Sequence, residues 1–123
     1  MVVHGTAFPL TRQGGKKDAI PFFKVSDMNR PGNEEELTRA ENYVDEGTAR
    51  LLGAKICPPG TVVFPKVGGA LLTNKKRVLG VTGTFDNNVM GLVPNTSVID
   101  PDWLRLWFER IDIAKFANTQ ALP

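Results

Sequence analysis

The stretch between residues 56 and 92 is divided into short apolar segments, each about the length of one β-strand. Pro, Gly and Asn residues, which are typical of turns, separate these segments. Because the separating turns are short, we expect successive hairpins in one antiparallel or mixed sheet. An earlier strand is expected where Pro21 begins an aromatic segment, after a loop over residues 5–19. The predicted strands lie at residues 20–26, 61–64, 70–73, 77–79, 82–85 and 88–92.

Two short helices are predicted between the first strand and this stretch. Asn33 and Glu36 have the spacing of a capping box, which predicts a helix over residues 34–43. A second helix is expected at residues 45–52, where Gly53 would end it.

A longer helix is predicted after the last strand. Asp100 directly precedes Pro101, a pair that favours a helix start. Trp103 extends an apolar stripe that we expect to pack on the sheet, and a last helical turn is predicted at residues 112–118. The stripe consists of Leu104, Trp107, Phe108 and Ile111. The predicted fold class is therefore α+β, a twisted mixed or antiparallel sheet of short strands with a few short helices packed on it.

The chain of 123 residues has the size of one globular domain, with one cysteine, Cys57, and one histidine, His4. This composition excludes disulfide frameworks and four-ligand zinc or iron–sulfur sites, and it favours a reducing, cytoplasmic setting. The glycine-rich stretch 68–75 lacks the Gly-Lys-Ser/Thr ending of a phosphate-binding loop. We therefore expect no catalytic centre, no metal and no cofactor.

Apolar runs in this chain are short. None reaches the 18 residues that a membrane-spanning helix needs, so we expect no membrane partner. The first residues also lack a basic segment followed by an apolar one, so no secretory signal is predicted.

Charge is distributed unevenly along the chain. Residues 47–85 contain six basic residues and no acidic residue, whereas residues 30–46 contain six acidic residues and two arginines. Segregation of this kind favours an anionic partner on one face, and nucleic acid is the first candidate. The alternative is that both runs are ordinary solvated surface.

Three predicted loops carry residue types that contact DNA. They span residues 24–30, 66–69 and 73–77. Lys and Arg neutralise phosphates, Arg and Asn read base edges, and the glycines at 68 and 69 allow a close approach of backbone to phosphate. Hydrophilic hairpin turns are the alternative interpretation of the same residues.

Five blocks of sequence, in order, resemble a target recognition domain of the type I restriction-modification specificity subunit. The blocks are residues 5–9, 20–28, 60–69 running into 72–77, 85–92 and 116–123. The resemblance implies a DNA methylase specificity domain-like fold with loops in a DNA groove and no catalysis of its own. It implies double-stranded DNA, methyltransferase subunits and restriction subunits as partners, together with a second recognition domain. Residues 1–123 would form one such domain, truncated before the spacer helix.

The resemblance also divides the residues by role. Shared blocks are expected to build the scaffold or hold phosphates, and they carry Lys66, Gly68, Gly69, Thr73, Asn74, Lys75, Arg77, Asp86, Asn87 and Asn88. Base readout is expected in the unshared stretches, residues 11–18 and 29–50. The likeliest phosphate contacts are Lys66, Lys75, Lys76 and Arg77. The full predicted DNA-binding set is Arg12, Lys16, Lys17, Lys24, Arg30, Lys66, Gly68, Gly69, Thr73, Asn74, Lys75, Lys76 and Arg77.

Two other functions fit the same sequence. One is a protein-interaction or regulatory half-subunit that pairs with another specificity chain. The other is the recognition part of a fused restriction-methylation enzyme.

Overall fold

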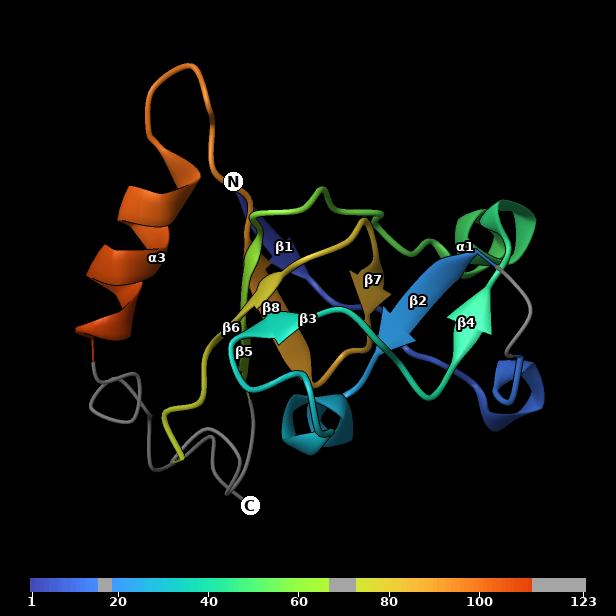
Figure 1. The fold of residues 1–123 in the computed structure, drawn as a ribbon. Helices are drawn as coiled ribbons and strands as arrows, with labels where there is room; N and C mark the ends of the chain where they lie inside the picture. The colour runs from blue at the N-terminus through green and yellow to red at the C-terminus, as the bar shows by residue number, and fades with distance from the viewer. Residues whose placement is uncertain (16–18, 67–72, 112–123) are drawn as a thin grey trace, which may run out of the picture.

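The computed structural model describes residues 1–15, 19–66 and 73–111 of the chain (Figure 1). The strands are β1 (Val2–His4), β2 (Ile20–Phe23), β3 (Glu36–Leu37), β4 (Tyr43–Val44), β5 (Val62–Pro65), β6 (Arg77–Leu79), β7 (Thr84–Phe85) and β8 (Val89–Leu92). The helical elements are the 3-10 turns η1 (Leu10–Arg12) and η2 (Val25–Asn29) and the α-helices α1 (Glu46–Leu52) and α3 (Pro101–Glu109).

The larger sheet has the strand order β1-β8-β5-β6-β3. Its central strands pair antiparallel, and Val62 and Val63 of β5 lie opposite Val78 and Arg77 of β6. The two segments are therefore antiparallel neighbours in one sheet, as the predicted sheet class allows, although the sequence analysis placed a further strand between them in the chain. At the edge, β3 joins β6 in parallel.

The smaller sheet has the order β4-β2-β7, with β2 antiparallel to β4 and parallel to β7. The expectation that all strands after residue 56 share one sheet is therefore wrong for β7. Backbone hydrogen bonds in both directions between Cys57 and Gly83 hold the chain just before β7. The next residues, Thr84 and Phe85, then pair with Phe22 and Phe23 instead of with β6 or β8.

The two faces of β2 lie in two different hydrophobic clusters. Phe23 belongs to the main core together with Val63, Phe85 and Val89, which come from both sheets. Phe22 packs with Val44 and Ala49 beneath α1. Neither phenylalanine is exposed, so β2 connects the main core to the α1 side of the molecule.

The predicted end of α1 at Gly53 and the predicted cap of α3 are confirmed, and α1 also has an N-cap that was not predicted. Asp45 accepts a hydrogen bond from the backbone N–H of Thr48 at 2.6 Å, and Gly53 ends α1 with a φ of 72°. Such a left-handed backbone favours glycine because it has no Cβ. Asp100 accepts a hydrogen bond from the N–H of Asp102 at the start of α3.

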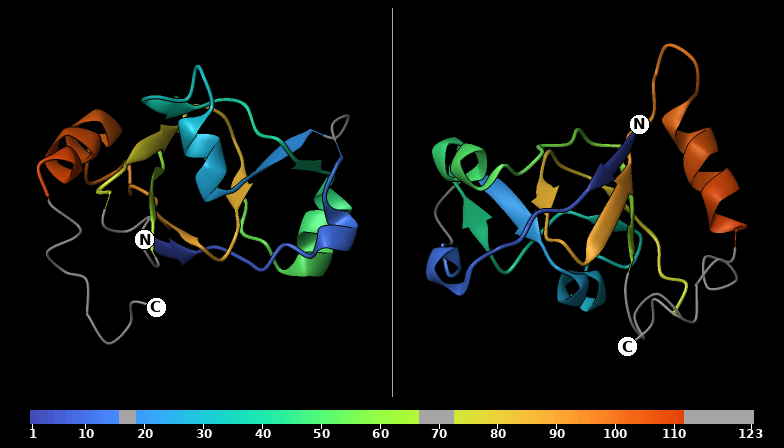
Figure 2. Two further views of the ribbon diagram at one scale, coloured as in Figure 1. Left: turned by 90° about the horizontal axis from the view of Figure 1, so that it is seen from below. Right: turned by 180° about the vertical axis from the view of Figure 1, so that it is seen from behind.

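Helix α3 packs on the outer face of the larger sheet, on the opposite side of the molecule from α1 (Figures 1 and 2). Phe108 is buried there against Val62, with Leu104 and Ile111 beside it, as predicted. The expected packing is wrong for Trp103 and Trp107, which are 56% and 48% exposed. Their rings stack on each other instead, with centroids 6.3 Å apart.

The predicted helix over residues 34–43 is wrong, because this segment contains β3, β4 and a loop. Asn33 does not cap a helix; its side chain is fully buried and bonds to loop backbone. Long-range pairing with β6 then takes residues 36 and 37 into the sheet. The strand predicted at 20–26 ends earlier, at Phe23, because Val25 begins the turn η2.

Two predicted elements lie outside the described residues in whole or in large part. They are the strand at residues 70–73, of which only Thr73 is described, and the helical turn at residues 112–118.

Candidate nucleic-acid interface

Several loops lie side by side along the lower edge of the molecule in Figure 1, and we call this region the loop rim. It comprises residues 10–15, 24–30, 38–42 and 86–88, together with Lys66 after β5 and residues 73–75 before β6. Backbone hydrogen bonds join its parts, from Tyr43 to Gly15 at 2.7 Å and from Lys66 to Asn88 at 3.0 Å. The structure thus brings together loops that are far apart in sequence.

Asp27 connects two of these loops from below the surface. Its side chain is 2% exposed, and its carboxylate accepts hydrogen bonds from the backbone N–H groups of Lys24 at 2.8 Å and Glu41 at 3.0 Å. The Nε atom of Arg30 lies 3.5 Å from the same carboxylate. One buried acidic group therefore fixes the turn η2 against the loop 38–42.

Asn33 holds the same loop through its carboxamide. The Nδ2 atom donates to the carbonyl oxygens of Asp27 at 2.9 Å and Arg39 at 2.8 Å. The Oδ1 atom accepts from the N–H groups of Thr38 at 3.1 Å and Arg39 at 3.4 Å. This side chain supplies partners that the backbone would otherwise lack, because the loop has no regular secondary structure.

A third buried polar side chain, Asn42, extends the network to the first loop. Its Oδ1 atom accepts a hydrogen bond from the N–H of Gly14 at 2.8 Å. In the same loop, Gln13 donates to the carbonyl of Phe8 and accepts from the Lys24 amine at 3.5 Å. Satisfied networks of this kind hold loops in one geometry, so the loop rim is a pre-organised surface.

Five of the seven described cations in the predicted DNA-binding set lie on the loop rim, and two of these, Lys66 and Lys75, are among the four predicted phosphate contacts. Lys24, Arg30 and Lys75 are half-buried there, and the Lys75 amine donates to the side-chain oxygen of Asn29. Lys66 is half-buried next to the turn 86–88, and Arg12 is exposed at the end of η1. The structure therefore assembles positive charge from separate segments on one edge.

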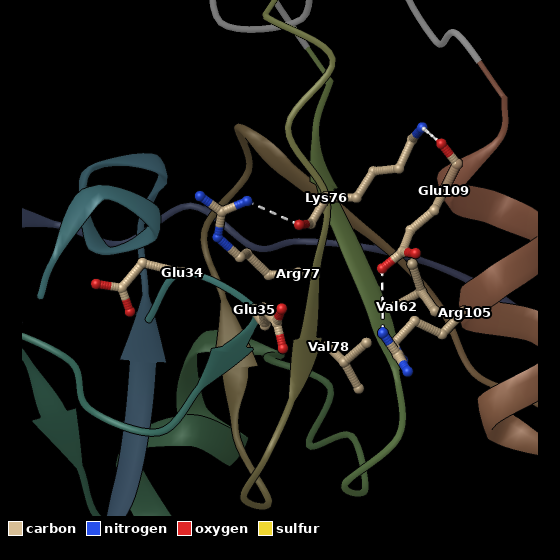
Figure 3. A pocket seen from close by; sticks show the side chains of 8 residues that line it. All are labelled: Glu34, Glu35, Val62, Lys76, Arg77, Val78, Arg105 and Glu109. Atoms are coloured by element: carbon tan, nitrogen blue, oxygen red, sulfur yellow. Dashed lines mark hydrogen bonds and ion pairs between the residues drawn. The ribbon is translucent and has the colours of Figure 1, made fainter. Parts of the chain in front are cut away.

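Arg77 and Lys76 are directed into the fold instead of toward this edge (Figure 3). The Arg77 guanidinium donates to the carbonyl oxygens of Asn33 at 2.7 Å, Lys76 at 2.8 Å and Met28 at 3.1 Å. The Lys76 amine donates to the carbonyls of Glu109 and Ile111 at the end of α3. These contacts give both residues a role in fixing loops and α3.

Arg77 and Lys76 also line a hollow of about 290 Å³ between α3 and the edge of the larger sheet (Figure 3). Three carboxylates share this hollow, those of Glu34, Glu35 and Glu109. A hydrogen bond from the N–H of Gly32 lowers the pKa of Glu34. The acidic run of the sequence thus faces part of the basic run here.

The remaining predicted DNA-binding residues are only partly described. Lys16, Lys17, Gly68 and Gly69 lie outside the described residues. Thr73 and Asn74 form the turn before β6, where Asn74 has a left-handed φ of 55°. Asparagine tolerates this backbone better than most residues, which explains its place at the turn.

Asp86 is a buried acidic residue on the loop rim. Its burial raises the pKa of the carboxyl group, and a hydrogen bond from the N–H of Asn88 at 3.0 Å opposes this effect only in part. The backbone leaves no space nearby, since a Cβ on Gly5 would lie 1.7 Å from the Asp86 carbonyl oxygen. Asp86 therefore anchors the turn 86–88 from inside.

Two further sites were tested in the described residues. Cys57 is buried, and this burial raises the pKa of its thiol, which makes it a poor nucleophile. Within the described ranges, no three His, Cys, Asp or Glu side chains lie close enough together to hold a metal ion. No helix among those residues is long and apolar enough to cross a membrane.

The sequence analysis did not identify the buried side chains that organise the loop rim. Asp27 was treated as part of a turn and Asn33 as a helix cap, and Asn42 was not singled out. Their partners are backbone groups of other loops, so no short-range spacing reveals them. The one available signal was the presence of Asp and Asn in segments with few apolar residues, where such side chains often replace backbone partners.

Comparison with known proteins supports the fold through structure and not through sequence. No family model matches the sequence, and no curated protein matches it significantly. The HsdS subunit from Thermoanaerobacter tengcongensis is similar in structure, with a TM-score of 0.68 at 15% identity over 98% of this chain and 28% of that chain. A chain from a structural study of complex assembly and conformational transition of the type I R-M system gives a TM-score of 0.67, also at 15% identity, over 98% and 27%.

The present chain thus spans less than a third of the length of these two proteins. The alignment nevertheless includes nearly all of its own elements, both sheets as well as the helices. This agrees with the resemblance predicted from the sequence blocks and confirms the predicted fold class: the chain has an α+β fold found within HsdS subunits of type I restriction-modification systems.

Proposed function

We propose that this chain is a sequence-specific DNA recognition module of a type I restriction-modification system. The observation that carries the proposal is the loop rim, where Lys24, Lys66 and Lys75 lie on loops that buried polar side chains hold in place. Binding sites are often built from loops on a rigid scaffold, and basic loops of this kind suit a phosphate backbone. The likeness to HsdS subunits supports the same function.

In this proposal the chain itself carries out no reaction. It binds double-stranded DNA and directs methyltransferase and restriction subunits to the target, together with a second recognition domain. Its single thiol, buried and unpaired, suits the reducing cytoplasm in which such a complex would work.

The salt dependence of DNA binding tests the loop rim directly. The full chain is titrated by fluorescence anisotropy against a randomised duplex pool at several salt concentrations, with and without a methyltransferase subunit. Lys75→Ala should reduce the slope of log affinity against log salt by about one, because one phosphate contact is lost. In the wild-type chain, the Lys75 amine would leave the side-chain oxygen of Asn29 and bind a phosphate of the DNA.

Lys55→Ala is the matched control, because it removes an exposed cation that lies outside the loop rim and outside the stretches predicted to contact DNA. This variant should leave the slope unchanged. An unchanged slope for Lys75→Ala as well would show that this lysine makes no phosphate contact. A wild-type chain that binds no duplex, with or without the methyltransferase subunit, would refute the proposed function.

A protein-interaction half-subunit is a second candidate, and the exposed outer face of α3 favours it. Trp103, Leu106 and Trp107 are each about half exposed there, a composition that is enriched in protein interfaces. Co-purification with a methyltransferase subunit without retention of DNA would support this function over the first.

A further inference from the structure

The loop at residues 38–42 is ordered although it has no regular secondary structure. Each backbone N–H from Thr38 to Glu41 donates to a side chain: Thr38 and Arg39 to Asn33, Ala40 to the Tyr43 hydroxyl at 3.3 Å, and Glu41 to Asp27. A loop that satisfies its backbone in this way has little freedom left to lose on binding.

The backbone of Arg39 is held at two points by Asn33. Its N–H donates to the carboxamide oxygen of Asn33, and its carbonyl accepts from the carboxamide nitrogen of the same residue. The next residue, Ala40, is 8% exposed and anchors the loop in the main core. The Arg39 side chain is exposed, so a rigid backbone presents it to solvent.

Most arginines in the described part of the chain are engaged by the fold. Arg30, Arg50 and Arg105 form ion pairs, and Arg77 binds backbone carbonyls. Among the described residues, the arginine side chains without a hydrogen bond or ion pair are those of Arg12, Arg39 and Arg110.

These three differ in position and support. Arg110 is the C-cap residue of α3, outside the loop rim, and Arg12 ends a short 3-10 turn with the Asp45 carboxylate near enough to interact electrostatically. Arg39 alone among them combines a place on the rim with a backbone held by a buried side chain.

The charge next to Arg39 favours a base over a phosphate as its partner. Glu41 is exposed two residues away and forms no ion pair among the described residues. A carboxylate at this position repels phosphate, whereas the edge of a base carries no net charge. An arginine fork pairs best with the O6 and N7 atoms of guanine in the major groove.

We propose that Arg39 is a specificity-determining residue that reads a guanine in the DNA target. The proposal rests on the proposed function of DNA recognition and assigns one of its base contacts. It also requires that the loop 38–42 enters the groove while Lys66 and Lys75 hold the backbone.

Selection from a randomised duplex pool tests this assignment, using the full chain and its variants Arg39→Ala and Arg39→Lys. The wild-type chain should enrich a motif that includes at least one guanine. Both variants should lose the preference at that position by about 10- to 100-fold, while the other positions of the motif remain. Arg39→Lys retains the charge and should keep the salt dependence of the wild type.

The outcomes separate this proposal from the function on which it rests. Unchanged motifs in both variants, or affinity lost equally for all duplexes in Arg39→Ala, would overturn the role of Arg39 and leave DNA recognition intact. A wild-type chain that enriches no motif would overturn both. Lys55→Ala serves as the charge-matched control and should enrich the wild-type motif, and thermal melting of each variant checks that the fold is retained.

Discussion

The loop rim and α3 represent two different ways of holding a surface segment in place. The rim is held by buried polar side chains, Asp27, Asn33 and Asn42, that bond to loop backbone. Helix α3 forms its own backbone hydrogen bonds, and it is held mainly by the apolar contact of Phe108 and its neighbours with the larger sheet.

The difference shows what each arrangement leaves at the surface. Polar anchors fix the rim in detail and leave cations and amides exposed, a surface suited to an anionic partner. The apolar contact of α3 is narrow, and it leaves Trp103 and Trp107 stacked on each other at the surface. Exposed aromatic side chains of this kind suit a protein partner more than a phosphate backbone.

The largest effect on stability is expected from Asn33→Ala. The change leaves the buried carbonyl of Asp27 and part-buried backbone groups of Thr38 and Arg39 without their partners. Each such group costs about 1–3 kcal/mol, so we expect the free energy of unfolding to fall by about 4 kcal/mol. Urea denaturation followed by circular dichroism measures this change.

Asn87→Ala is the matched control, because Asn87 is exposed on the same rim. It should change the free energy of unfolding by less than about 0.5 kcal/mol. If the two alanine variants were equally stable, buried polar side chains would not be what holds the rim.

A smaller effect is expected from Phe108→Ala on α3. Phe108 is 7% exposed and contacts the Phe64 ring with centroids 5.1 Å apart. Its loss should lower the free energy of unfolding by about 3 kcal/mol, at the lower end for a buried phenylalanine because the cluster is small. Hydrogen exchange should become faster in α3 while the amides of residues 38–41 keep their protection.

Leu106→Ala tests the outer face of the same helix. Leu106 is 53% exposed, so this variant should behave like the wild type in both measurements. Faster exchange at residues 38–41 in Phe108→Ala would contradict the separation of the two regions, since it would couple α3 to the rim.

The smallest effect is expected from Asp86→Asn and depends on pH. The pKa of Asp86 is raised in the folded chain. The protonated carboxyl group therefore favours the folded state, and this contribution to stability is complete at pH values below the ordinary Asp pKa. It is lost as the pH rises through the raised pKa. Asparagine keeps the acceptor for the N–H of Asn88 without the buried charge. The variant should therefore be more stable by about 0.5 kcal/mol at pH 7.

This gain should disappear in acid, where Asp86 is protonated in both states. Asp102→Asn on the exposed first turn of α3 is the control and should give no gain, because a carboxylate there interacts favourably with the helix dipole. A gain for Asp86→Asn that is the same at all pH values would rule out the buried charge as its cause.

Local signals in the sequence were enough to predict the parts of the fold that depend on neighbours in the chain. Gly53 predicted the end of α1, and the pair Asp100 and Pro101 predicted the start of α3. The apolar segments at 61–64 and 77–79 predicted the strands β5 and β6.

Long-range partners explain what could not be predicted. The role of Asn33 depends on carbonyl groups of Asp27 and Arg39, which no pattern of spacing brings together. For the same reason, the residue types could not predict which cations the fold itself engages. Arg77 serves backbone carbonyls that only the folded chain places around it, whereas Arg39 is left unengaged by the part of the fold that is described.

The way in which Asn33 supports the loop 38–42 has a consequence for how this surface can change over generations. All but one of the hydrogen bonds of its side-chain carboxamide go to main-chain atoms, and the exception is a long contact with the Thr38 hydroxyl at 3.5 Å. Main-chain atoms are the same whatever residue carries them. Mutation can therefore exchange the side chains at positions 39 and 41 on an unaltered support, and under the proposed function new DNA preferences would arise in this way.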